Sequence, residues 1–482
     1  MKTRPPIHDR TWPLAVVRDD APGELEDAGV DVSEYRTLRK LIWIFFWLLI
    51  VEGALRKWIL PRWSTPLLLV RDPVVILMYL SALSKGIFPR NGFMFWGTVL
   101  GIASGVTSLI GGEGTVLVTL YGLRTSFLYL PLIFIIPAVM TVKEVEKIGK
   151  WLLLTTPAMA LLVLVQFRSS PGAWINVGVG GAEGTQLTVG FDKIRPPGMF
   201  SFTSGLAAYL CLVVAFVFYW LIKRGAISAK IGYAAIVSTA VMVGVSGSRG
   251  VLISVVLMLA GMAYVCIRTQ KFFGRGVRAA FLITVLLCVL QMRHEFRQGM
   301  SILEDRITTS GGVREGLIVR TLSGFAEPFT AISDTPLFGR GIGLGTTVAG
   351  GLLYGERKFL LAEGEWSRIV RESGPILGFA YLGLRVGIVV LLFLIANRAL
   401  REENPLPILL VCATFPSFLT GQWGVSSLLG FATFSAGLCL AAARQPKAAP
   451  EPALFRVSEE SVTNPNRRVR GRSIYAEKLH GR

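Results

Sequence analysis

Arginines beside or within long apolar stretches carry the strongest chemical signal in this sequence. A charged side chain at the middle of a bilayer costs about 2.5–3.5 kcal/mol on insertion scales, so such arginines persist where they face a polar cavity or an anion. A guanidinium group binds two phosphate oxygens at once, which suits a pyrophosphate held at this depth. Each arginine could instead reach to the membrane surface or pair with a helix C-terminus. The candidate pyrophosphate-binding residues are Arg124, Arg195, Arg249, Arg320 and Arg340.

Glycines could bring a ligand close to the backbone at two places. Arg249 follows Ser246-Gly247-Ser248 and precedes Gly250, so small residues flank it on both sides. The run 339–345 has Gly-x-Gly-x-Gly spacing, but it lacks the Gly-Lys-Ser/Thr ending of a nucleotide loop. We expect this run to form a tight turn, although its backbone N–H groups could also approach a phosphate.

Three glutamates, Glu363, Glu365 and Glu372, are candidates for acid–base chemistry. One of them could act as a general base that takes a proton from an acceptor hydroxyl, which requires no metal. If the stretch is helical, Glu365 and Glu372 share a face with Arg368 between them, whereas Glu363 lies elsewhere. Exposed Glu–Arg pairs are usually only a solvated surface, and this simpler interpretation is favoured on spacing alone.

Two further acids, Glu52 and Asp72, lie within or near apolar stretches. They could line a proton path, or they could pair with Arg71, Arg56 or Lys57. We favour a structural ion pair, since buried charges in membranes are normally paired.

Metals, cofactors and nucleic acids are not expected. The five cysteines lie in apolar stretches without a CxxC pair, and the three histidines are scattered, so no metal site is predicted. The formal net charge is +19, but much of the excess lies in short loops and in the C-terminal tail. Positive charge in those places sets membrane topology, so it is not evidence of nucleic-acid binding.

The elements that must position these residues are membrane helices. The chain has 482 residues, 52% hydrophobic composition and a mean hydropathy of +0.56. Its apolar runs are long enough to cross a hydrocarbon core of about 30 Å, which predicts an all-α integral membrane protein. We predict about twelve spans, of which the first and the ninth are short: 41–56, 65–83, 94–111, 114–138, 151–167, 205–222, 230–246, 250–267, 279–292, 375–396, 405–420 and 424–442.

Basic residues orient these spans. The connection 268–278 holds four basic residues and no acid, which places it and both termini in the cytoplasm. Residues 1–35 are predicted to be a disordered cytoplasmic extension. The remaining segments are helices 1–9 (36–292) with a smaller outer loop (168–204), a large outer loop between helices 9 and 10 (293–374), helices 10–12 (375–442) and a basic cytoplasmic tail (443–482). Arg56, Lys57 and Arg62 fall on the outer side, where anionic partners would make them tolerable.

Four short fragments lie in order around the one large outer loop. They are Arg195-Pro-Pro-Gly-Met-Phe-Ser-Phe, Gly247-Ser-Arg-Gly250, Leu337-Phe-Gly-Arg-Gly-Ile-Gly343 and Arg371-Glu-Ser-Gly-Pro-Ile-Leu-Gly378. Together they resemble the O-antigen ligase and polymerase superfamily of polysaccharide-assembly membrane proteins. The resemblance covers roughly residues 190–440, and residues 36–140 look like an N-terminal half found in some bacterial members.

The resemblance implies a GT-C-like membrane fold and an inverting, metal-independent glycosyl transfer without a cofactor. The donor would be an oligosaccharide on undecaprenyl pyrophosphate, and the acceptor a hydroxyl of a glycan or lipid in O-antigen, lipopolysaccharide or exopolysaccharide synthesis. The expected site is the periplasmic face of the bacterial inner membrane, among membrane lipids and other polysaccharide-assembly proteins. Polymerase and ligase activity are equally compatible with these fragments.

The catalytic residues implied are Glu363 or Glu365 as base, with Arg249 stabilising the leaving charge. Ligases of the family carry a catalytic histidine shortly before a Glu-x-Gly motif. When the chain is aligned on Glu372-Ser-Gly, Glu363 stands at the position of that histidine. Two alternatives from other classes remain, namely a transporter for an anionic solute or glycan and a non-catalytic scaffold for polysaccharide export.

Overall fold

Apolar runs of the sequence form helices throughout the computed structural model, which describes residues 35–182, 186, 188–189, 193–223, 228–309, 312, 315, 319–355 and 359–444. The predicted N-terminal extension and basic tail lie outside these residues, apart from residues 35, 443 and 444. Nine helical segments in the described part are long and apolar enough to cross a membrane, so the chain is a multi-pass helical membrane protein. They are Pro66–Ser84, which contains α3 (Asp72–Ser84), α4 (Gly92–Gly111), Val116–Val139, which contains α5 (Val116–Leu123) and α6 (Leu132–Val139), α7 (Val142–Arg168), α8 (Thr203–Ile222), α10 (Arg249–Arg268), α11 (Gln270–Leu290), α15 (Glu365–Arg401) and α17 (Ser426–Ala443).

Three further predicted spans coincide with helices outside this set of nine. They are α2 (Arg36–Ala54), α9 (Ala229–Val245) and α16 (Leu406–Phe415), which a π-helical turn extends to Thr420. The helical membrane class is therefore confirmed, while the count of twelve spans and the GT-C-like fold stay predictions.

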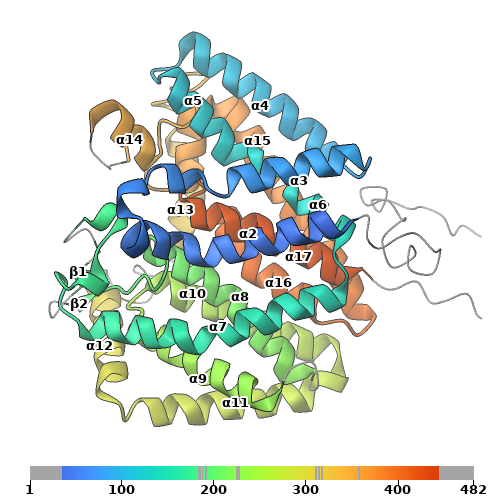
Figure 1. Ribbon diagram of the computed structural model, residues 1–482, viewed down its shortest axis with the longest axis vertical. Coiled ribbons are helices and arrows are strands. Elements are labelled where there is room, and N and C mark those ends of the chain that lie inside the picture. Colours follow the sequence, from blue (N-terminus) through green and yellow to red (C-terminus); the bar gives the residue numbers. More distant parts are fainter. Residues whose placement is uncertain are drawn as a thin grey trace, which may run out of the picture. The chain divides into compact units, whose positions relative to one another are not determined.

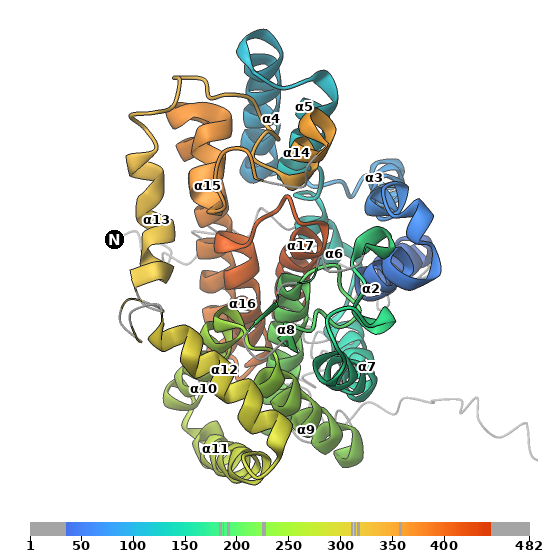
Figure 2. The same ribbon diagram turned by 90° about the vertical axis from the view of Figure 1, so that its left-hand side faces the viewer.

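The core of the helical assembly is formed by α8 and α17, whose apolar windows are 94% and 89% buried. Both helices pack against α16, and α17 also packs against α6. Figure 2 shows them between α16 on one side and α2 and α7 on the other. By contrast, only 6% of the window of α11 is buried, and α4 exposes a row of large apolar side chains that suits contact with lipid.

One predicted connection is wrong. The basic stretch 268–278 was expected to be a cytoplasmic loop, but α10 ends at Arg268 and α11 begins at Gln270. The three basic residues that follow lie on the first turns of α11, which is therefore longer than the predicted ninth span. Basic residues near a helix end keep their charges at the membrane surface, so charge alone does not separate a loop from a helix terminus.

The polar segments between the spans form short elements that gather on one side of the helices, at the left of Figure 1. They are β1 (Thr188–Val189) and β2 (Lys193–Ile194), which pair antiparallel, and the helices α12 (His294–Thr308), α13 (Arg320–Thr330) and α14 (Thr347–Tyr354). Helix α12 packs against α9, and α13 packs against α15. The predicted outer loop 293–374 is thus largely helical where it is described.

Helix α15 folds back on itself. It begins at Glu365, ten residues before the predicted span, and it bends at Gly374, which has φ 78° and ψ 169° and precedes Pro375. Residues 365 and 385 of a straight helix would lie about 30 Å apart, at a rise of about 1.5 Å per residue. Arg385 Nη1 is nevertheless 2.6 Å from Glu365 Oε1. Residues 365–373 therefore form a short helix that packs alongside the span.

Candidate functional site

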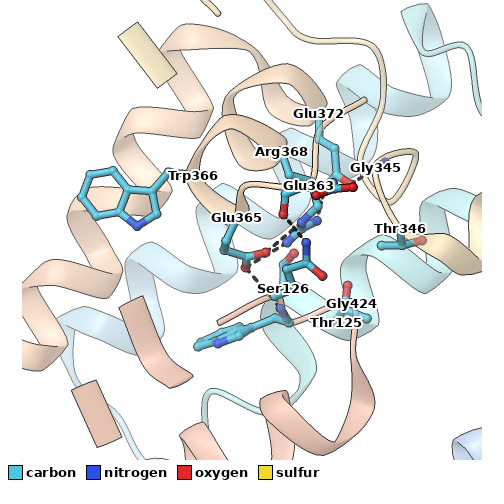
Figure 3. A network of polar contacts seen from close by, with 12 residues as sticks. Thr125, Ser126, Gly345, Thr346, Glu363, Glu365, Trp366, Arg368, Glu372 and Gly424 are labelled. Atoms are coloured by element: carbon cyan, nitrogen blue, oxygen red, sulfur yellow. Dashed lines mark hydrogen bonds and ion pairs between the residues drawn. The ribbon is translucent and has the colours of Figure 1, made fainter. Parts of the chain in front are cut away.

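The fold-back of α15 holds a buried network of two glutamates and two arginines (Figure 3). Arg368 Nε and Nη2 donate to the two carboxylate oxygens of Glu365 at 2.9 and 3.0 Å, and its Nη1 donates to Glu372 Oε2 at 2.6 Å. Arg385 Nη1 donates to Glu365 Oε1 at 2.6 Å. The second oxygen of Glu372 accepts the backbone N–H of Gly345 at 2.8 Å.

This network is closed on itself. Every one of its four side chains is no more than 1% exposed, and two positive charges balance two negative ones. The predicted spacing of Glu365, Arg368 and Glu372 on one helical face is confirmed, but the favoured interpretation of a solvated surface is wrong. Both oxygens of Glu365 are occupied by guanidinium groups, so this carboxylate is better suited to fixing the fold than to accepting a substrate proton.

Glu363 lies just before the short helix, and it differs from Glu365 in the exposure and the pairing of its carboxylate. Its side chain is exposed, and it takes no part in the four-residue network. Its backbone carbonyl accepts a hydrogen bond from Gln422 Nε2, which anchors the segment. Figure 3 draws it together with Glu365 and Arg368. Geometry therefore favours Glu363 over Glu365 as the candidate base.

The glycine-rich run 339–345 completes the broken helix. Pro375 has no N–H, and the bend at Gly374 removes the usual partners of the carbonyl groups one turn earlier. The backbone N–H groups of Arg340 and Gly341 replace them, each donating at 3.0 Å to the carbonyls of residues 371 and 372. A Cβ on Gly339 would lie 2.2 Å from the Glu372 carbonyl oxygen, so only glycine permits this approach. These N–H groups are occupied, which makes the run structural.

A second polar cluster surrounds Glu52 on α2. Arg71 Nε lies 2.8 Å from Glu52 Oε2, and Arg56 Nη1 donates to Oε1 at 3.2 Å. Arg71 Nη2 also donates to the Ser426 carbonyl at 2.5 Å, and Arg56 Nε donates to the Ser64 carbonyl at 2.8 Å. The ion pair predicted for Glu52 is confirmed, and the carboxylate gives both buried arginines an anionic partner.

Asp72 continues this cluster, with a partner other than those predicted. It pairs with Arg124, which lies in the π-helical turn Arg124–Leu128, through Nε at 2.5 Å and Nη2 at 3.0 Å. The Tyr129 hydroxyl donates to the same carboxylate at 2.6 Å. A π-helical turn widens the backbone and often marks a functional position. Here it directs Arg124 towards α3, and its side chain is only 9% exposed.

The two assemblies differ in how fully their donors are paired. In the second cluster, the carboxylates of Glu52 and Asp72 lie among the guanidinium groups of Arg56, Arg71 and Arg124. The Nη1 atoms of Arg71 and Arg124 are buried and have no hydrogen-bond partner among the described residues. Buried unpaired donors are costly, so they are expected where an acceptor binds. The cluster therefore keeps two unpaired buried donors among the described residues, whereas every carboxylate oxygen of the closed network accepts a hydrogen bond.

Two chain segments connect the cluster with the network. Arg385 Nε donates to the Phe418 carbonyl at 3.0 Å, and the following residues lead to Ser426, which binds Arg71. The π-helical turn that carries Arg124 also accepts a hydrogen bond from Tyr381 on α15, through the Ser126 carbonyl at 2.7 Å. The fold thus brings Glu363, the network and the guanidinium cluster into one region.

The other predicted arginines lie apart from this region or at its edge. Arg249 Nη1 donates to the Arg306 carbonyl on α12 at 3.4 Å. This hydrogen bond involves no residue of the α15 network. Arg340 Nη1 lies 3.8 Å from Glu113, on the glycine-rich run. Arg195 follows β2 and is half-buried. Arg320 begins α13, but its side chain lies outside the described residues.

Sequence reasoning missed Arg385. This residue lies inside the predicted span 375–396, so the argument that a charged side chain in a membrane needs a partner applied to it as well. Its guanidinium is fully buried and lies 3.9 Å from the centre of the Trp423 ring. The signal was present, but only the fold-back of α15 shows that Glu365 is its partner.

Among the residues that the structure describes, no group of three or more histidines, cysteines, aspartates or glutamates is arranged to hold a metal ion. No family model matches the chain, and no curated protein matches it. The functional interpretation is therefore built on the geometry of the cluster and the network.

Proposed function

We propose that the protein is a membrane glycosyltransferase that transfers an oligosaccharide from undecaprenyl pyrophosphate to an acceptor hydroxyl, as a glycan polymerase or ligase. The observation that carries this proposal is the guanidinium cluster around Glu52 and Asp72, in which the Nη1 atoms of Arg71 and Arg124 are buried without a hydrogen-bond partner among the described residues. Guanidinium groups fixed before the reaction suit a pyrophosphate, whose charge grows as it leaves.

The chemistry needs three roles. The acceptor oxygen attacks the anomeric carbon and forms the new glycosidic bond. The bond from that carbon to the pyrophosphate oxygen breaks, and its electron pair leaves with the lipid pyrophosphate, whose charge Arg71 and Arg124 stabilise. The exposed carboxylate of Glu363 takes the acceptor proton. Attack opposite the leaving group inverts the anomeric configuration.

The proposed location is the bacterial inner membrane, with the site on the periplasmic face of a twelve-span, GT-C-like fold. Support comes from the basic residues Lys143, Lys147 and Lys150 on the first turns of α7, at the end of that helix opposite the segment 169–182. The short elements β1, β2 and α12–α14 lie together on one side of the helices in Figure 1, as an outer assembly around a lipid-borne glycan would require.

Complementation of a deletion strain tests this function. Wild type, Arg124→Lys and Glu363→Gln would be expressed at matched levels, with the exposed Arg168→Lys as control. We expect loss of surface polysaccharide for the first two variants and none for the control. If the two variants accumulate single repeat units, the protein is a polymerase. If they leave glycan chains of normal length on the lipid carrier, it is a ligase. Wild-type polysaccharide from both site variants would favour the transporter or scaffold instead.

A further inference from the structure

An open groove runs between α4 and the helices that follow it. Its volume is about 690 Å³, and nearly all of its lining is apolar. On the α4 side its edge is formed by Ile102, Val106 and Leu109, which are 63%, 48% and 58% exposed. The opposite wall comes from residues 120–131. In a membrane helix such exposed apolar edges face hydrocarbon, so the groove opens towards lipid.

Three glycines shape this groove. Gly97, Gly101 and Gly105 lie at successive four-residue steps on α4 and line it. A Cβ on Gly101 would lie 3.3 Å from the Phe127 ring, and one on Gly105 would lie 3.2 Å from Leu123. At these glycines α4 therefore lies close to residues 123 and 127 at the bottom of the groove. Because glycine has no side chain, it leaves space between the two walls. A single extended hydrocarbon chain suits so narrow a space better than a bulky polar group.

Two arginines lie at or near the groove. Arg124 lines the groove, while its guanidinium belongs to the cluster around Asp72. Beyond Leu109, α4 ends in the turn that contains Glu113, whose N–H donates to the Arg340 carbonyl at 2.7 Å. The Arg340 side chain is 38% exposed and its ion pair with Glu113 is loose, at 3.8 Å. Its Nε is buried without a hydrogen-bond partner in the described part of the chain.

We propose that this groove holds the isoprenoid chain of the lipid-linked donor, with its pyrophosphate between Arg340 and Arg124. The proposal rests on the proposed function and adds the place where the lipid chain lies. One groove takes one chain, and a cation at the end of an apolar groove complements a lipid that carries its phosphate at the end of a single chain. The groove also shares Arg124 with the guanidinium cluster, which connects the chain site with the proposed reaction site.

Binding of undecaprenyl phosphate to the purified full-length protein, followed by native mass spectrometry, tests the proposal without glycan transfer. Val106→Trp fills the groove from an exposed position, and Val99→Trp is a matched control on the same helix, 39% exposed and outside the lining. We expect affinity on the order of tenfold weaker for the first variant and unchanged for the second. Arg340→Gln should weaken undecaprenyl phosphate by about tenfold but leave undecaprenol unaffected.

Three outcomes would overturn the proposal. Val106→Trp could bind undecaprenyl phosphate as well as Val99→Trp does. A two-chain phosphatidylglycerol could displace the isoprenoid lipid at equal concentration, which would make the groove a general lipid contact. Arg340→Gln could weaken undecaprenol as much as the phosphate. Any of these results leaves the proposed function intact if Arg124→Lys still abolishes polysaccharide, so the two proposals fail separately.

Discussion

Arg385 Nη1 lies 2.6 Å from Glu365 Oε1, although the two residues are 20 positions apart on the two arms of the broken helix α15. The bend at Gly374 makes this contact possible, and the Arg368 guanidinium also donates hydrogen bonds to the Glu365 carboxylate. The ion pair fixes the short helix 365–373 against the span. It thereby sets the position of Glu363, the exposed carboxylate at the head of that helix.

Arg385→Met should destabilise the protein strongly. It removes one of the two guanidinium groups that hold Glu365 in a buried site, and breaking a buried ion pair costs about 3–5 kcal/mol. The expected result is a lower melting temperature in detergent. Lys271→Met is the control, because its pair with Glu403 is more than half exposed and such pairs contribute little. Equal melting temperatures for the two variants would contradict the structural role of the network.

Gly374→Ala should also destabilise the fold. Its φ of 78° costs an L-residue roughly 1–2 kcal/mol, and a Cβ would lie 2.1 Å from the Leu337 carbonyl oxygen. Gly383→Ala on the same helix has no atom within 4 Å of the new Cβ and should be neutral or slightly stabilising. Limited proteolysis of the two variants would compare the fold-back directly. A Gly374→Ala protein as resistant as Gly383→Ala would show that the bend does not need glycine.

Glu363→Gln should reduce transfer without unfolding the protein. The substitution removes the proposed base, and general base catalysis typically contributes about 10²–10⁴ in rate. Because the side chain is exposed, its melting temperature should match that of Glu304→Gln, an exposed residue on α12. The rate would be measured from chain growth on the lipid carrier. An unchanged rate for Glu363→Gln would remove this residue from the mechanism.

Stability should rise with pH through the titration of Lys57. This residue follows the first predicted span, and burial lowers its pKa to about 7 from an ordinary value of 10.5. Between these values the unfolded chain binds a proton that the folded chain does not, so raising the pH from 7 towards 10.5 favours the folded state. Melting temperatures across this range should rise less in Lys57→Met than in wild type. The exposed Lys143→Met should keep the wild-type slope.

Local patterns predicted much of this fold. Apolar runs placed the helices, and the spacing of Glu365, Arg368 and Glu372 predicted their common face. Charge patterns did not distinguish a cytoplasmic loop from the end of a helix, because both are rich in basic residues. At 268–278 most of these basic residues belong to the start of α11. Hydropathy assigned 365–373 to the outer loop because the segment is charged.

The candidate site was harder to predict because its partners are distant in sequence. Asp72 pairs with Arg124, 52 positions away, and Arg71 binds Ser426 across 355 positions. No local spacing encodes such contacts. The burial of Arg385 could have been suspected from its place in an apolar span, but its partner depends on the bend at Gly374.

Glycosyl transfer from a lipid pyrophosphate should depend on the guanidinium cluster, because its charges stabilise the leaving pyrophosphate. The direct measurement reconstitutes the protein in nanodiscs with an undecaprenyl pyrophosphate-linked oligosaccharide, lipid and glycan acceptors, and EDTA. Released undecaprenyl pyrophosphate is then quantified by mass spectrometry. We predict release of undecaprenyl pyrophosphate with wild type and with Arg168→Lys, and loss of this release with Arg124→Lys. No release from folded wild-type protein, or equal release from Arg124→Lys, would contradict it.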